Sequence, residues 1–215
     1  MPATLIHEVL PVGLLQCNCH VVGDPQTREA IVIDPGDEPD SILAALHRHN
    51  LKVKAILITH AHPDHVGGAA KLKAATGAPV LMHADDRWLL ENVAMQCAAF
   101  GFPAPPAVAL DATLNPGDDV RWGKDLRAQI LHTPGHTPGS SCLYLPEQKI
   151  LFAGDTLFAG SIGRTDLWGG SYDAILRSIH SQLLPLADDT RVFPGHGPAT
   201  TMGEEREENP FLQGL

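Results

Sequence analysis

Short apolar runs separated by turn residues predict β-strands in both halves of the chain. In the first half these runs, each bounded by Gly, Pro, Asp or Asn, occupy residues 4–9, 20–22, 30–33, 55–59 and 79–82. In the second half they occupy residues 126–132, 141–145, 150–153 and 191–193. Apolar residues at three- and four-residue steps predict helices that open at 39–41 and span 69–76, 84–102 and 171–184, with a short solvated helix in the Glu-rich tail 204–208.

Strands in both halves, each with helices attached, predict an α/β fold in which two sheets pack together and helices cover them outside. The same periodicity also permits a single doubly wound sheet. The Pro-rich segment 102–106 interrupts the pattern. We interpret it as a surface connection or lid, because the residues that follow it do not make up a second, separate hydrophobic core. We therefore expect a single domain over residues 1–215.

Composition and charge narrow the classes of function. A chain of 215 residues with 44% hydrophobic and 19% charged residues is ordinary for one soluble globular domain. The net charge of −10 offers no basic patch for nucleic acid and disfavours electrostatic docking on a membrane. The first residues lack a secretory signal pattern, and no apolar run reaches the length of a membrane span. We expect a cytoplasmic protein without nucleic-acid or membrane partners.

One predicted strand ends in an unusual concentration of metal-binding side chains. Residues 55–59 are followed directly by His60, His62, Asp64 and His65. Alternate side chains of an extended backbone point to the same side, so His60 and His62 can converge on one cation. Pro63 favours a turn or the first turn of a helix, which directs Asp64 and His65 toward a second cation. Four such side chains within six residues predict a metal site.

Three further candidates share one sequence context, a polar residue after a strand-like run with glycine or proline beside it. They are His136, Asp155 and His196. Glycine beside a ligand lets the backbone approach closely and adopt turns that other residues resist. Together with the first cluster these residues make five histidines and two aspartates, which is enough for two metal ions with open coordination positions.

These motifs resemble the metallo-β-lactamase superfamily along nearly the whole chain. The motifs are Thr-His-x-His-x-Asp-His at 59–65, Pro-Gly-His-Thr-Pro-Gly at 134–139, Gly-Asp-Thr-Leu-Phe at 154–158 and Gly-His-Gly at 195–197. The chain is most similar to the small glyoxalase II-like thioesterases of that superfamily. The resemblance implies an αββα sandwich of two mixed β-sheets flanked by helices, with the metal ions at one edge between the sheets.

The resemblance also implies seven ligands in two groups: His60, His62 and His136 for a first ion, Asp64, His65 and His196 for a second, and Asp155 as a bridge between them. Asp34, at the end of the strand that precedes the first motif, resembles the family's outer carboxylate and would orient a ligand histidine. Zinc is the expected metal, with iron or manganese as alternatives, because histidine and aspartate accept all three.

Two divalent ions about 3.5–4 Å apart can share a water molecule and lower its pKa toward neutrality. We therefore expect hydrolysis by a metal-bound hydroxide, with Asp64 and Asp155 as the catalytic carboxylates. A small-molecule thioester is a suitable substrate, because its thiolate leaves without a strong general acid. By the resemblance the enzyme would be a hydroxyacylglutathione hydrolase. The sequence does not decide between a monomer and a homodimer.

The substrate is less closely defined than the metal site. Arg164 falls where glyoxalase II enzymes carry a basic residue near the substrate and would hold a glutathione carboxylate, although an ion pair with Asp166 is an equal alternative. We expect the chain to lack the C-terminal helical domain of full-length glyoxalase II. The alternatives are a lactonase and a persulfide dioxygenase, whose single iron would be held by His60, His136 and Asp155.

Overall fold

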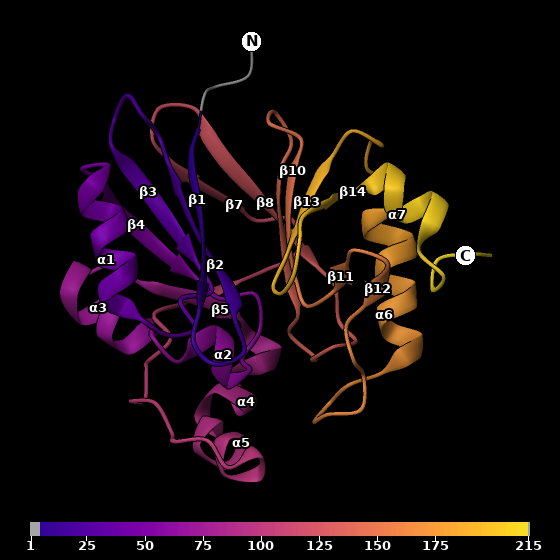
Figure 1. Ribbon diagram of the computed structural model, residues 1–215, viewed down its shortest axis with the longest axis horizontal. Coiled ribbons are helices and arrows are strands. Elements are labelled where there is room, and N and C mark those ends of the chain that lie inside the picture. Colours follow the sequence, from indigo (N-terminus) through magenta and orange to yellow (C-terminus); the bar gives the residue numbers. More distant parts are fainter. Residues whose placement is uncertain (1–4, 215) are drawn as a thin grey trace.

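The first half of the chain forms a mixed six-stranded sheet in the computed structural model, which describes residues 5–214 (Figure 1). The strands lie in chain order: β1 (Ile6–Val12), β2 (Cys17–Gly23), β3 (Glu29–Ile33), β4 (Lys52–Leu57), β5 (Val80–His83) and β6 (Ala112–Leu114). β1, β2 and β3 pair antiparallel, and β3 to β6 pair parallel. The strand predicted at 4–9 is observed as β1, and Thr4 lies outside the described residues.

The second half forms another mixed sheet of six strands. Along the chain these are β7 (Asp119–Trp122), β8 (Leu126–His132), β9 (Ser141–Leu145), β10 (Ile150–Gly154), β13 (Arg191–Pro194) and β14 (Thr200–Thr201). Their order across the sheet is β14-β13-β10-β9-β8-β7, and β10 and β13 form its parallel pair. A small hairpin, β11 (Leu157–Phe158) with β12 (Ser161–Ile162), follows β10.

Helices cover the outer face of each sheet, so the molecule has four layers (Figure 1). The first sheet is accompanied by α1 (Pro39–Arg48), α2 (Pro63–Val66), α3 (Ala69–Thr76), the 3-10 turn η1 (Ala84–Asp86), α4 (Arg87–Glu91) and α5 (Val93–Phe100). The second is accompanied by α6 (Tyr172–Ser178), the π-helical turn η2 (Ile179–Leu183) and α7 (Met202–Glu208). The predicted αββα sandwich of two mixed sheets is confirmed.

The central strands are apolar along both faces because they are buried on both. In β3, Ile31 and Ile33 pack against Phe152 and other residues of the opposite sheet, whereas Ala30 and Val32 face the outer helices. Strands buried in this way read as continuous apolar runs, which is why the sequence predicted them readily.

Two predicted helices differ from the observed ones. Residues 84–102 form the three pieces η1, α4 and α5, because Asn92 leaves the helical conformation and separates α4 from α5. Leu89, Val93 and Cys97 of the predicted apolar face are buried, but 54% of Trp88 is exposed. The helix predicted at 171–184 continues from α6 into the wider turn η2.

Candidate metal centre

Loops at the carboxyl ends of four strands carry the predicted ligands to one edge of the sandwich. His60 and His62 follow β4, and α2 begins at Pro63, in agreement with the prediction that this proline favours a turn or the first turn of a helix. The structure brings all seven predicted ligands together there: His60, His62, Asp64, His65, His136, Asp155 and His196.

Three histidines form the first candidate ligand group. The Nε2 atoms of His60 and His136 are 3.2 Å apart, and Nδ1 of His62 lies 3.1 Å from His60 and 2.9 Å from His136. All three side chains are buried. Nitrogen ligands about 2.0 Å from a tetrahedral zinc ion are separated by roughly 3.3 Å, so this spacing fits one ion.

The second ligand group consists of Asp64, His65 and His196. Oδ2 of Asp64 lies 3.1 Å from Nε2 of His196 and 3.7 Å from Nε2 of His65. Asp155 lies between the two groups, since its Oδ1 is 3.4 Å from His65 Nε2 and its Oδ2 is 3.5 Å from His136 Nε2. A carboxylate in this position can contribute one oxygen to each group.

Several polar atoms of the centre are buried without a partner. Nε2 of His62, Nε2 of His65 and Oδ1 of Asp155 have no hydrogen-bond partner within residues 5–214. Buried polar atoms are rarely left unpaired, and an absent ion or water is one of the few physical explanations. Gly195 precedes His196, and a Cβ at this glycine would collide with Oδ1 of Asp155. The donor set and its tight packing therefore fit divalent metal ions.

Burial and neighbouring charges shift the pKa values of side chains in both groups. Burial lowers the pKa of His60, of His62 and of His136, which keeps these rings neutral, the form that binds metal. Burial alone would raise the pKa of Asp64, but the charge on His65 and the hydrogen bond from His196 outweigh it and lower this pKa. The Asp64 carboxylate is thus ionised and attracts positive charge.

Asp34 lies behind His65, one of the candidate ligands. Its Oδ2 is 3.0 Å from Nδ1 of His65 and accepts from the Thr59 hydroxyl at 2.6 Å, and its Oδ1 accepts from the Thr59 N–H at 2.7 Å. The side chain is 2% exposed, which strengthens these bonds. This carboxylate fixes the orientation of the His65 ring, so that Nε2 faces Asp64 and Asp155.

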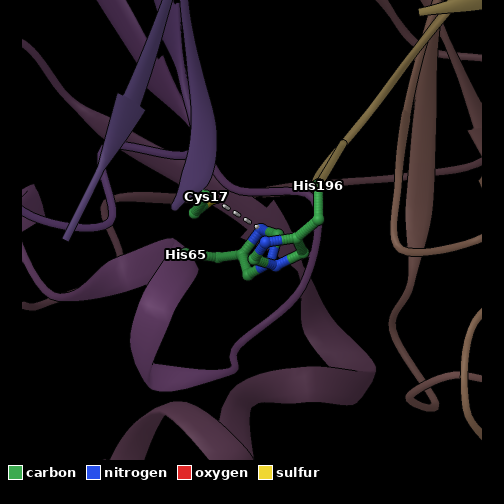
Figure 2. Close-up of side chains that lie close together, drawn as sticks. All are labelled: Cys17, His65 and His196. Carbon is green, nitrogen blue, oxygen red and sulfur yellow. Dashed lines mark hydrogen bonds between the residues drawn. The ribbon is translucent and has the colours of Figure 1, made fainter. Parts of the chain in front are cut away.

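Cys17 lies on the same side of His65 as Asp34 does. Figure 2 shows Cys17, at the start of β2, beside His65, with the ring of His196 close by. Its Sγ is 3.6 Å from Nδ1 of His65, whereas Nε2 of that ring faces the other ligands. Burial raises the pKa of the Cys17 thiol to about 12, so the group stays protonated. We therefore interpret Cys17 as packing behind the ring, away from the ligand atoms.

Asn18, which the sequence analysis did not single out, fixes the loop of His196. Its side-chain amide donates to the carbonyl of Pro194 at 3.0 Å and to that of Gly197 at 2.9 Å, and its N–H donates to the carbonyl of Gly195 at 2.7 Å. A lone asparagine in a strand gives no signal for this role, because its partners lie far away in the sequence.

The backbone of Arg164, but not its guanidinium group, contacts the centre. Its carbonyl is 2.8 Å from Nδ1 of His136, which fixes that ring. The exposed guanidinium group is paired with Asp166 by hydrogen bonds of 2.7 and 2.9 Å, and the bond from Arg164 lowers the pKa of Asp166 to about 2. The ion pair considered in the sequence analysis is present, and substrate binding by Arg164 stays a prediction.

A second histidine cluster lies outside this centre. The rings of His83 and His132 stack with centroids 3.9 Å apart and an angle of 10° between their planes, near Asp85. A metal ion lies in the plane of each imidazole that binds it, and two nearly parallel planes do not meet close to the rings. This arrangement does not favour a shared ion.

The four layers and the centre rich in histidine and aspartate are those of the metallo-hydrolase superfamily. The chain belongs to the metallo-beta-lactamase superfamily, whose model matches residues 12–196. Over 206 residues it is 39% identical to the hydroxyacylglutathione hydrolase GloC of Haemophilus influenzae, an alignment that covers 95% of this chain and 97% of the relative.

Two solved structures are also similar to this chain. The B3 metallo-beta-lactamase BLEG-1 superposes with a TM-score of 0.91 at 39% identity, over 97% of this chain and all of that one. A di-iron-bound form of TTHA1623 superposes with a TM-score of 0.85 at 42% identity, over 95% of this chain and all of that one. Within residues 5–214, none of the helices combines the length and the hydropathy needed to cross a membrane.

Proposed function

We propose that the protein is a metal-dependent thioesterase of the glyoxalase II type, which hydrolyses S-D-lactoylglutathione or a related thioester within a single domain. The observation that carries this proposal is the position of Asp155, whose two oxygens face His65 and His136 in two separate ligand groups. Two groups with a shared carboxylate favour a pair of ions. The similarity to GloC supports a glutathione thioester as the first substrate to test.

Zinc is the metal that we propose first, with iron or manganese as alternatives, and the di-iron form of TTHA1623 supports keeping iron among them. Bound at this centre, two such ions would supply an activated water nucleophile and an electrophile for the developing oxyanion. The first ion would be held by His60, His62 and His136, the second by Asp64, His65 and His196, and both by Asp155.

The remaining chemistry belongs to the side chains of the chain. Those of Asp64 and Asp155 are 20% and 12% exposed, so water and substrate can reach these two carboxylates. The oxygens of these side chains can accept a hydrogen bond from the attacking water and direct its lone pair toward the acyl carbon. Cys17 is buried and protonated, which removes the nearest thiol as a nucleophile. A thioester suits this arrangement, because its thiolate leaves without a strong general acid.

Arg164 is the residue that we propose to bind a substrate carboxylate. Its pair with Asp166 is exposed, and exposed ion pairs contribute little to stability because water screens the charges. A glutathione carboxylate can therefore replace Asp166 at small cost and form the same bidentate pair.

The alternative dioxygenase needs three ligands, His60, His136 and Asp155. It leaves Asp64, His65 and His196 without a role, although their ligand atoms gather beside Asp155. A lactonase would use the same residues on an oxygen ester. The similarity to BLEG-1 adds a β-lactam to the substrates worth testing.

Loss of thioester absorbance from S-D-lactoylglutathione tests the proposal, with enzyme loaded separately with zinc, manganese and ferrous iron. We expect metal-dependent turnover that stops on chelation. A lactone, a β-lactam and a persulfide with oxygen uptake serve as comparison substrates. Turnover of one of these without turnover of any thioester would refute the thioesterase proposal.

A further inference from the structure

A buried carboxylate outside the ligand set lies behind the first ligand group. Asp86, the last residue of η1, is fully buried. Its Oδ2 accepts hydrogen bonds from the Ala61 N–H at 2.9 Å and from the Thr137 hydroxyl at 2.8 Å. Its Oδ1 accepts a hydrogen bond from the Gly139 N–H at 2.6 Å. One side chain thus connects the two loops that carry the three histidines of this group.

The loop with the first two histidines is held from both sides. Ala61 lies between His60 and His62, and its N–H donates to Asp86. Its carbonyl accepts a hydrogen bond of 3.0 Å from the side-chain amide of Gln96, a fully buried residue of α5. The peptide groups around Ala61 are therefore fixed by two buried side chains, and these contacts also fix the backbone of the neighbouring His60 and His62.

The loop with the third histidine is held by the same carboxylate. Thr137 directly follows His136, and its hydroxyl contacts both Asp86 and, at 2.7 Å, the hydroxyl of Ser140. A Cβ at Gly139 would lie 2.7 Å from Cγ of Asp86, so glycine is what lets the backbone approach the carboxylate. The position of His136 relative to His60 thus depends on Asp86.

The chemistry of these contacts requires a carboxylate. Three donors point at Asp86, two of them backbone N–H groups that can only donate. An ionised carboxylate presents acceptors at both oxygens, whereas an amide presents one acceptor oxygen and a donor group. Asparagine would therefore place a donor against at least one of the three partners.

We propose that Asp86 is the positioning residue of the first ligand group and sets the affinity of that group for its ion. The inference rests on the proposed metal centre. Asp34 serves the second group through His65, so each half of the centre has its own buried carboxylate behind it. Substitution of an outer residue of this kind typically costs 10–100-fold in metal affinity.

Titration of the metal-free protein with cobalt(II), followed by its visible spectrum and by competition with zinc, tests this inference. We expect two binding phases in the unsubstituted protein, and His196→Ala identifies the phase of the second group. Asp86→Ala should weaken the affinity for cobalt in the phase of the first ligand group by about 10–100-fold and leave the affinity in the phase of the second group unchanged. Asp86→Asn and Thr137→Val should give smaller losses in the same phase, because each keeps part of the network.

Asp85→Asn is the matched control, since Asp85 is exposed and adjacent in the sequence, and it should leave both phases unchanged. Unfolding of each metal-free variant in denaturant shows whether it is folded. Equal weakening of both phases, or none, in the Asp86 variants would overturn the inference. Absence of metal binding by the unsubstituted protein would instead refute the proposed centre, and the inference with it.

Discussion

Replacing Asp34 with asparagine should weaken metal binding by the second ligand group and leave the first group unaffected. The Thr59 N–H can only donate, so the amide oxygen must stay with it, and the new NH2 group then faces His65. In the unsubstituted protein the carboxylate accepts a hydrogen bond from Nδ1 of His65, so Nε2 is the nitrogen that gives up its proton to bind an ion. The amide favours the opposite tautomer, in which Nε2 carries the proton and cannot bind metal.

The size of the effect follows from these contacts. A 10–100-fold loss of affinity for the second ion corresponds to about 1.4–2.7 kcal/mol. The fold should survive, because asparagine tolerates the φ of 49° that Asp34 adopts. Asp34→Ala differs, since it removes the acceptor of three buried donors, at about 1–3 kcal/mol for each donor left unpaired, and adds about 1 kcal/mol for the left-handed backbone. That variant loses a large part of a typical 5–15 kcal/mol of stability.

Cobalt(II) titration with zinc competition measures both affinities of Asp34→Asn, and urea unfolding of the metal-free protein measures its stability. Asp37→Asn is the matched control, because Asp37 is exposed in the same turn. Unchanged affinity for the second ion in Asp34→Asn would refute the assignment of Asp34 to His65. Equal weakening of both ions would show that the two halves are not separately supported.

Three further predictions follow from the same contacts. Asp155→Ala should weaken both ions and abolish turnover while circular dichroism shows the fold intact; full activity would exclude the bridging role. Arg164→Ala should raise KM for the glutathione thioester roughly tenfold with little change in kcat, and Asp166→Asn should lower KM. Burial lowers the pKa of His7 to about 4 and that of His20 well below its usual value, whereas unfolded histidine titrates near 6.5. The neutral pair therefore stabilises the fold above pH 6.5, and the free energy of unfolding should fall as the pH drops toward 4, less so in His7→Phe.

The sequence predicted the parts of the fold whose signals are local. The strands at 126–132 and 141–145 and the helix at 69–76 have the predicted bounds, because apolar residues and turn formers mark their ends. It missed edge strands such as β6, β7 and β14, which are short and partly polar. Their conformation comes from pairing with neighbouring strands, which no local pattern records.

In the site, too, residues with a local sequence signal could be predicted and residues with distant partners could not. The seven candidate ligands could be identified because histidine and aspartate clusters after strands are chemically unusual, and the structure places them together. Asp86 and Asn18 could not be identified. Asp86 bonds to Gly139, 53 residues away, and Asn18 bonds to Pro194, 176 residues away. Only the folded chain brings these partners together.

The most direct test of the central claim is to add zinc in measured equivalents to the metal-free protein while following hydrolysis of S-D-lactoylglutathione. The two ligand groups and the shared Asp155 predict that activity rises until two ions are bound per chain and then stays constant. Maximal activity at one ion per chain, or no thioester hydrolysis at any ratio with any of the three metals, would contradict the account.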